Sequence, residues 1–289
     1  MASVLTNLFD GVAYGMLLFV LACGLAVTLG LMNFVNLAHG AFAMAGGYVC
    51  AVLVNNSGWP FFAALPLAFA ASAAIGALME RALYRHLYTR SHLDQVLFSI
   101  GLVFMSVAAV DYVMGSARVF IKLPSALEGQ IDLFGVGIGR YRLMIVVICG
   151  LLTLALQLIL SKTRFGSRLR AAVDDPRAAI GLGINVPQVF SFTFAFGCGL
   201  AGLGGALSAE ILGLDPYFPL KFMIYFLIVV TVGGSSSITG PFLASLLLGI
   251  ADVAGKYYVP KMGPFVIYTV MIVILIWRPN GLFGRTAAR

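Results

Sequence analysis

The chain has very little charge. Only 10% of its 289 residues are Asp, Glu, Lys or Arg, whereas 61% are apolar and the mean hydropathy is +1.01. A soluble domain carries about 25% charged residues, so a soluble protein of this length could not cover its surface with this composition. The bilayer must therefore act as the solvent for much of the chain, which excludes an ordinary water-soluble enzyme fold.

Motifs for chemistry are also missing from the sequence. It contains no G-x-x-x-x-G-K-[ST] segment, so it has no P-loop and is not expected to hydrolyse ATP itself. No zinc motif, Ser–His–Asp set or pair of carboxylates in a soluble pocket is apparent. The cysteines Cys23, Cys50, Cys149 and Cys198 each lie inside an apolar run without metal-ligand spacing. We expect them to be small core residues, with no disulfide, metal or cofactor in this chain.

The amino terminus, MASVLTNLFDG, has no Lys or Arg, and no small-residue cleavage site follows the first apolar run. These features argue against a secretory signal peptide, so the first run is expected to stay as a permanent span. The net charge is +7. In a membrane protein such an excess is explained by basic loops on the cytoplasmic side, so we do not expect nucleic acid as a partner.

The apolar runs predict an all-α fold: a polytopic transmembrane helical bundle with about nine spans, in which residues 1–289 form one membrane domain. The spans are expected near residues 8–31, 40–55, 61–80, 96–115, 141–160, 189–212, 220–233, 240–257 and 263–277. The seventh and ninth runs are short for a membrane crossing.

Basic residues are concentrated in three segments that nine spans place on one side of the membrane: the linkers 81–92 and 161–188 and the tail after residue 277. These segments hold 11 of the 18 Lys and Arg residues, namely Arg81, Arg85, Arg90, Lys162, Arg164, Arg168, Arg170, Arg177, Arg278, Arg285 and Arg289. The positive-inside rule makes this side the cytoplasm. We therefore expect the amino terminus outside and the carboxyl terminus in the cytoplasm.

Two stretches at the ends of apolar runs resemble each other, LMNFVNLAHGAF (31–42) and VGGSSSITGPF (232–242). Each precedes a small-residue-rich run, a Pro-containing loop, another run and a basic segment. This order suggests a degenerate parallel repeat of residues 8–92 and 220–289, a common plan in transporters. The alternative is a chance similarity between two apolar hairpins.

Polar side chains at membrane depth are candidates for a substrate path. Asn33, Asn36 and His39 are spaced three residues apart, so one helical face is expected to carry all three. The alternative is hydrogen bonding between helices, with Asn36 ending one helix and starting the next. The turn GGSSSITG (233–240) either binds a polar substrate or forms a tight turn between helices. Its hydroxyls belong to Ser235, Ser236, Ser237 and Thr239.

A glycine pattern, Gly197-x-Gly199-x-x-Gly202, formally matches a dinucleotide-binding fingerprint. That fingerprint requires a strand before it and a helix after it in a βαβ unit. Here the pattern lies inside an apolar run, so we expect it to serve close packing between helices.

The stretch RFGSRLRAAVDDPRAAIGLGIN (164–185) is charged and too long for a tight turn. We expect two short helices, because Pro176 begins a helix more readily than it extends one and Asp175 is well placed as its N-cap. The second helix would present small and apolar side chains such as Ile180 and Leu182 with charges beside them. It would either lie on the lipid surface or dock into a groove of a soluble partner.

Four segments occur in order along nearly the whole chain: NFVNLAHGAFAMAGGY, RAAVDDPRAAIGLGINV, GGSSSITGPFLASLLLG and RPNGLFG. Together they resemble the permease family of branched-chain amino-acid ABC importers, and in particular the shorter of its two permease types. The resemblance implies that the loop at 161–188 contains a cytoplasmic coupling helix that contacts an ATPase. The residues it implies for this contact are Arg164, Arg168, Arg170, Asp174, Asp175, Pro176 and Arg177, with Gly181 and Gly183 allowing close packing.

The resemblance also implies an assembly in a bacterial inner membrane. Its partners would be a second permease subunit, two cytoplasmic ATPases that bind ATP and Mg, a periplasmic solute-binding protein and membrane lipid. Branched-chain amino acids, urea, amides and aromatic or dicarboxylic acids all remain open as cargo. The alternative is an ion-coupled secondary transporter or channel without an ATPase, for which Asp111, Glu210 and Asp252 are candidate acids. A membrane scaffold without transport is a third possibility.

Overall fold

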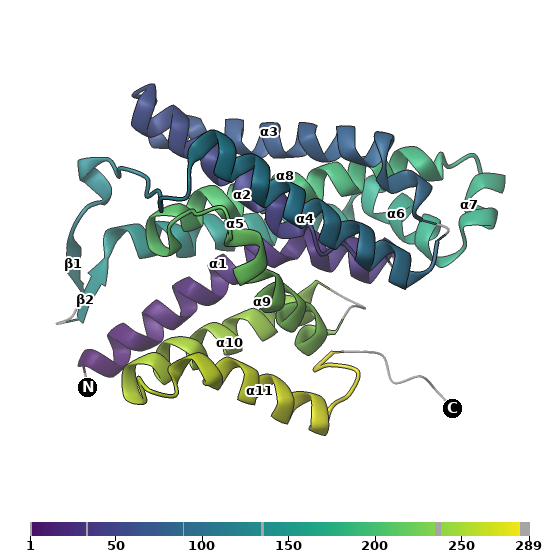
Figure 1. Cartoon of the computed structure of the whole chain (residues 1–289). Coiled ribbons are helices and arrows are strands. Elements are labelled where there is room, and N and C mark those ends of the chain that lie inside the picture. The colour runs from purple at the N-terminus through teal and green to yellow at the C-terminus, as the bar shows by residue number, and fades with distance from the viewer. Residues whose placement is uncertain (1, 33, 89, 134–135, 235–237, 284–289) are drawn as a thin grey trace.

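The structure is a computed structural model that describes residues 2–32, 34–88, 90–133, 136–234 and 238–283. Its long helices lie side by side in a bundle, with a small β-hairpin at one end and two short helices at the other (Figure 1).

Eleven α-helices make up most of the described chain. In chain order they are α1 (Ala2–Met32), α2 (His39–Ala51), α3 (Phe61–Ala82), α4 (His92–Met114), α5 (Arg140–Lys162), α6 (Arg164–Asp174), α7 (Pro176–Gly181), α8 (Val186–Leu212), α9 (Phe218–Gly233), α10 (Thr239–Tyr258) and α11 (Gly263–Trp277). A π-helical turn, Val52–Asn56, extends α2, and single 3-10 turns occur at Tyr84–His86 and Ser125–Leu127.

Each of the nine predicted spans coincides with one of these helices, and the second includes the π-helical turn. Five of them, α1, α3, α4, α5 and α8, are long and apolar enough to cross a membrane, and α9 and α11 are shorter apolar helices. The chain is therefore a multi-pass helical membrane protein, as the composition predicted. The number of crossings stays a prediction.

The connection between α4 and α5 departs from the all-α prediction. It contains the strands β1 (Gln130–Leu133) and β2 (Val136–Gly139), which pair antiparallel with Gln130 opposite Gly139. An isolated antiparallel bridge also joins Val119 to Leu214. A stretch of only four residues per strand carries too little periodicity to predict, and cross-strand pairing here satisfies backbone groups that no helix uses.

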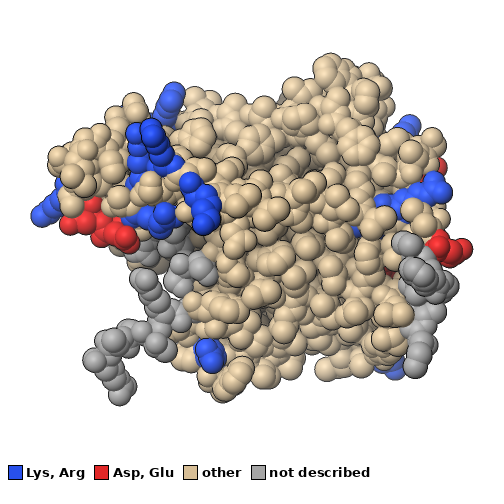
Figure 2. Space-filling view, turned by 180° about the vertical axis from the view of Figure 1, so that it is seen from behind, with Lys and Arg blue, Asp and Glu red and all other residues tan. Residues whose placement is uncertain are grey.

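Charged side chains gather at the two ends of the bundle. Figure 2 shows Lys, Arg, Asp and Glu clustered over the α6–α7 end and again at the opposite end, with a broad belt of uncharged surface between them. The start of α1 and the end of α11 lie at opposite ends of the bundle (Figure 1). This distribution matches a protein whose middle lies in hydrocarbon and whose two ends lie in water.

Helix α8 and helix α1 form the centre of the bundle. In their most apolar 18-residue windows, 72% of α8 and 78% of α1 is buried, compared with 17% of α4 and 22% of α5. Glycines permit this close approach: a Cβ at Gly46 would lie 2.3 Å from the Gly202 Cα, and a Cβ at Gly24 would lie 2.3 Å from the Gly197 carbonyl oxygen. The glycine pattern of α8 thus serves helix packing, as the sequence indicated.

The four cysteines are buried and unpaired, as expected.

Candidate functional site

The first predicted path element lies at a break between α1 and α2. Helix α1 ends at Met32 and α2 begins at His39, and the backbone of residues 34–38 is not helical. The prediction that one helical face carries Asn33, Asn36 and His39 is therefore wrong. Asn33 itself lies outside the described residues. A local bond from the Ala38 N–H to Asn36 Oδ1, 3.1 Å long, competes with continued helix, as short polar side chains commonly do.

Asn36 is the polar centre of this break. It is fully buried, and its Oδ1 also accepts a hydrogen bond of 3.0 Å from the Tyr84 hydroxyl. Its Nδ2 has no hydrogen-bond partner among the described residues. Asn36 thus connects the break to the 3-10 turn after α3. It neither ends α1 nor begins α2, and a role for it in a substrate path stays a prediction.

The α3–α4 connection holds the break from the other side. Gln95 at the start of α4 accepts a 3.2 Å bond from the Val35 N–H and donates to the Leu87 and Arg90 carbonyls. Burial raises the pKa of the Tyr84 phenol, so the hydroxyl stays protonated and can act as a donor. Side chains from a segment about 50 residues away in the chain therefore define the shape of the break.

His39 is the first residue of α2 and is only 1% exposed. Its Nε2 lies 3.0 Å from the Leu21 carbonyl oxygen, and its ring meets Phe226 edge to face. A Cβ at Gly24 would lie 2.5 Å from the His39 ring, so glycine there makes room for the imidazole. Within the described ranges, no group of three or more His, Cys, Asp or Glu is placed to hold a metal. A path-lining role for His39 stays a prediction.

The second predicted path element lies between α9 and α10. Helix α9 ends at Gly233, Gly234 has a φ of +85°, and Thr239 is the exposed first residue of α10. Ser235, Ser236 and Ser237 lie outside the described residues, so their predicted role is untested. A Cβ at Gly233 would lie 2.3 Å from the Pro241 nitrogen, which supports the alternative of a tight turn between helices.

The predicted coupling loop forms two short helices that diverge at Asp175. The Asp175 side chain accepts hydrogen bonds from the Arg177 N–H, at 2.9 Å, and the Ala178 N–H, at 3.0 Å. Pro176 is the first residue of α7, and Gly183 follows that helix with a φ of +80°. The predicted N-cap and helix start are both confirmed.

The residues predicted for ATPase contact share one property: all of them are exposed, on α6, on α7 or in the two residues 175 and 183 that flank α7. They are Arg164, Arg168, Arg170, Asp174, Asp175, Pro176, Arg177, Gly181 and Gly183. A Cβ at Gly181 or Gly183 would meet no atom within 4 Å. Neither glycine serves packing within this chain, and Gly183 is required by its positive φ. Ile180 and Leu182 are also exposed, at 60% and 80%.

The coupling loop is nevertheless attached firmly to the bundle. Ala172 of α6, Ala179 of α7 and Val186 of α8 form a small buried cluster, and Phe190 packs against it. Leu169 on the same face of α6 is 1% exposed. This packing connects α6 and α7 to the first turns of α8.

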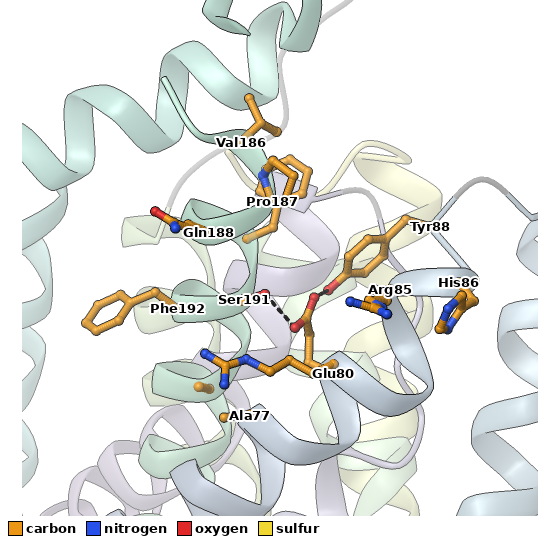
Figure 3. Close-up of a pocket in the computed structure, with 13 residues that line it drawn as sticks. Ala77, Glu80, Arg85, His86, Tyr88, Val186, Pro187, Gln188, Ser191 and Phe192 are labelled. Carbon is orange, nitrogen blue, oxygen red and sulfur yellow. Dashed lines mark hydrogen bonds between the residues drawn. The ribbon is translucent and has the colours of Figure 1, made fainter. Parts of the chain in front are cut away.

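Sequence reasoning missed a second connection, from α8 to the break. Phe190 meets the ring of Tyr88 at 6.1 Å between centroids, and Tyr88 meets Phe34 at 5.3 Å. Figure 3 shows the Glu80 carboxylate between Tyr88 and Ser191 of α8, and it accepts hydrogen bonds from both hydroxyls. Glu80 is 2% exposed. The one available signal was a carboxylate in the last turn of an otherwise apolar run.

Comparison with known proteins places this chain in a family. A family model described as "Branched-chain amino acid transport system / permease component" matches residues 7–275. The chain is 28% identical to the high-affinity branched-chain amino acid transport system permease protein LivH of Escherichia coli K12, over 97% of this chain and 96% of the relative. It is 29% identical to BraD of Pseudomonas aeruginosa with the same coverage. It is 25% identical to Escherichia coli LivM, of which 68% is covered. No solved structure gives a significant match.

Proposed function

The chain belongs to the permease family of branched-chain amino-acid transport systems, and from this premise we propose how it works. It is the permease subunit of an ABC importer rather than an enzyme. Its cargo is a branched-chain amino acid or a related small polar solute, because the relatives that it resembles over almost their whole length are permeases for such amino acids.

We propose the following topology and assembly. All nine helices that coincide with the predicted spans cross the inner membrane of a bacterium, with the amino terminus outside and the α6–α7 end in the cytoplasm, where the basic residues gather. A second permease completes the pathway, since relatives of both the LivH and the LivM type match this chain. Two ATPases bind ATP and Mg on the cytoplasmic side, and a periplasmic binding protein delivers the solute.

The observation that carries the proposal is the construction of the coupling loop. Helix α7 presents exposed apolar and charged side chains to the surroundings, whereas its inner face is packed onto α8. An exposed element that is rigidly attached to the bundle suits the transfer of motion from a soluble motor. Closure of the ATPases would displace α7, and α8 would pass that displacement through Phe190 and Tyr88 to the break between α1 and α2.

Asp174 offers a sharp test of docking. It is the last residue of α6. The negative end of the helix dipole lies there, so a carboxylate at this position destabilises the helix. Asp174→Lys should therefore stabilise α6 slightly, yet it should reduce ATP-dependent uptake strongly if the carboxylate contacts the ATPase. The measurement is solute uptake by proteoliposomes that contain the complete importer and its binding protein.

A matched variant separates docking from folding. Asp175 caps α7, so its reversal would damage the helix as well as the charge. Asp175→Asn keeps the cap, because asparagine is an equally good N-cap residue, and removes only the charge. Unchanged uptake and unchanged ATPase binding by both Asp174→Lys and Asp175→Asn would refute the docking role of these acids.

The alternative of ion-coupled transport depends on a buried acid. Of its candidates, Asp111 is exposed, Glu210 is partly exposed and Asp252 is 1% exposed. Asp252 Oδ2 pairs with Lys256 Nζ at 2.5 Å, whereas Oδ1 has no partner in the described part of the chain. The lysine already neutralises the carboxylate, which weakens the case for an ion site. Solute uptake driven by an ion gradient, with this chain alone in the vesicle, would favour the alternative.

A further inference from the structure

A large open cavity lies between the end of α3 and the start of α8. Its volume is about 1000 Å³, and its walls come from Ala77 to Tyr88 on one side and from Val186 to Ala195 on the other. Figure 3 shows the two walls, with Gln188 and Phe192 on α8 and Arg85 and His86 beyond the end of α3. This size is at the upper end of the range for small-molecule sites. The proposed mechanism uses Tyr88 and Phe190 in its wall but assigns no ligand to the space itself.

The basic side chains of the lining lie at one end of the cavity. Arg81, Arg85 and His86 lie where α3 ends, opposite Val186, Pro187 and Gln188 at the start of α8, and Ala77 and Ala195 lie further into the bundle. Gln188 and Ala195 are separated by seven residues of α8, or about 10 Å of helix at 1.5 Å per residue. In the proposed topology the polar end lies at the cytoplasmic headgroup layer and the other end at the depth of the acyl chains.

The two arginines are free to bind an anion. Neither Arg81 nor Arg85 has a carboxylate within 4.0 Å in the part of the chain that the structure describes. The one acid in the lining, Glu80, is buried, and both of its oxygens accept hydrogen bonds from the hydroxyls of Tyr88 and Ser191.

The apolar wall continues beyond this cavity. Phe192 is 58% exposed and also lines a second, apolar cavity of about 410 Å³ beneath α6. Its ring meets Phe165 of α6 at 5.1 Å between centroids. An acyl chain lying along Phe192 would therefore contact the wall that connects the cavity to the coupling loop.

We propose that this cavity binds a phospholipid with an anionic headgroup. The phosphate would lie against Arg81 and Arg85, and the acyl chains would lie along Ala77, Ala195 and Phe192. Basic pockets between helices on the cytoplasmic side are suited to acidic lipid headgroups. The order of cations and apolar groups along the cavity matches an amphiphile, whereas a free phosphate would have no use for the apolar end. This inference depends on the proposed orientation of the chain.

The test measures lipid retained by the purified complete importer, using native mass spectrometry with phosphatidylglycerol, phosphatidylcholine and inorganic phosphate added in turn. The wild type should retain phosphatidylglycerol in preference to phosphatidylcholine. Loss of each arginine, in Arg81→Gln and Arg85→Gln, should lower this retention about fivefold. Arg90→Gln is the matched control, because Arg90 belongs to the same connection but does not line the cavity, and it should retain the lipid.

Further variants keep the inference falsifiable. Ala77→Leu fills the apolar end and should reduce retention of phosphatidylglycerol without changing retention of phosphate. The pair Arg81→Lys and Arg85→Lys should keep the lipid, which controls for misfolding of the glutamine variants. Equal retention of both lipids, an equal loss in Arg90→Gln, or no effect of Ala77→Leu would overturn the inference. A cross-link between a cysteine placed at position 192 and the second permease would also overturn the inference, because a protein would then cover the wall assigned to the acyl chains.

A labelling experiment separates failure of this inference from failure of the proposed topology. Arg85→Cys should react with a membrane-impermeant maleimide in inverted vesicles and not in right-side-out vesicles. Reaction only from the outside would refute the topology. Reaction from the cytoplasmic side together with no lipid preference would refute the lipid site alone.

Discussion

The two helix breaks of this permease, α1–α2 and α9–α10, are held in different ways. At the first break, buried side chains make the connections. Tyr84 and Gln95 come from a distant segment, and they bond to Asn36 and to the backbone of the break respectively. At the second break the backbone itself makes close contact, since Gly233 and Gly240 lie against each other and the Val232 carbonyl accepts a bond from the Leu282 N–H. Two similar stretches of sequence thus reach interrupted helices by different physical means.

The difference also concerns what each break is connected to. The first contacts Tyr88, and through Phe190 it contacts the packing around the coupling loop. The second contacts the segment after α11, near the carboxyl end of the described chain. In the proposed mechanism the first break responds to the ATPases, and the second acts as a rigid support.

The largest expected effect is at the backbone contact of the second break. Gly233→Ala would place a Cβ 2.3 Å from the Pro241 nitrogen and should lower the free energy of unfolding by about 3 kcal/mol, as overpacking does. Gly101→Ala on α4 is the control, since a Cβ there meets nothing within 4 Å and alanine favours helix. Thermal unfolding in detergent would measure both. Equal stability of the two variants would refute the tight-contact account.

A smaller loss is expected at the first break. Asn36→Ala would leave the Tyr84 hydroxyl and the Ala38 N–H without their acceptor, at a cost of about 2 kcal/mol in unfolding free energy. Asn185→Ala is a matched change at an exposed N-cap, where the side chain accepts from the Gln188 N–H, and should cost about 1 kcal/mol. If the exposed change proved as costly as the buried one, Asn36 would not be the centre of the break.

The bond between Asn36 and Tyr84 can be isolated by a double-mutant cycle. Tyr84→Phe removes only the hydroxyl and should cost about 1 kcal/mol in the wild type. In the Asn36→Ala background the same change should cost almost nothing, because the hydroxyl has already lost its partner. Additive losses in thermal unfolding would show that the two residues act independently.

The smallest effect is expected for the connection to the coupling loop. Tyr88→Phe keeps the aromatic contacts with Phe34 and Phe190 and loses the bond to Glu80, whereas Tyr88→Leu loses both. The ratio of solute transported to ATP hydrolysed should fall with Tyr88→Leu by the equivalent of about 0.5 kcal/mol and fall less with Tyr88→Phe. A fall of the same size with Phe104→Leu, a change at an exposed aromatic residue of α4 away from this contact, would contradict a specific connection.

Several features of the fold followed from local signals. The nine apolar runs predicted the positions of the nine long helices, since burial in lipid requires continuous apolar segments. Asp175 and Pro176 predicted the start of α7, because capping depends on groups within three residues of each other. The glycine pattern of α8 was correctly assigned to packing, because its surroundings excluded a βαβ unit.

Other features could not be predicted from local signals. The face expected to carry Asn36 and His39 does not exist, since the spacing rule assumes that the helix continues. Tyr84 and Gln95 come from another part of the chain, and no spacing in the sequence relates them to Asn36. No spacing in the sequence relates Glu80 to Tyr88 and Ser191, whose hydroxyls both donate to its carboxylate. The four-residue strands were too short to show a period.

Composition and periodicity were enough to establish a helical membrane protein with a capped, charged loop between α5 and α8, because lipid solvation and helix capping act over one turn or one span of chain. The construction of the first break, the attachment of the coupling loop to α8 and the cavity beside Arg81 and Arg85 required the folded arrangement. Each of these joins residues from separate helices, and the energy of such a contact depends on distances in space that the order of residues along the chain does not specify.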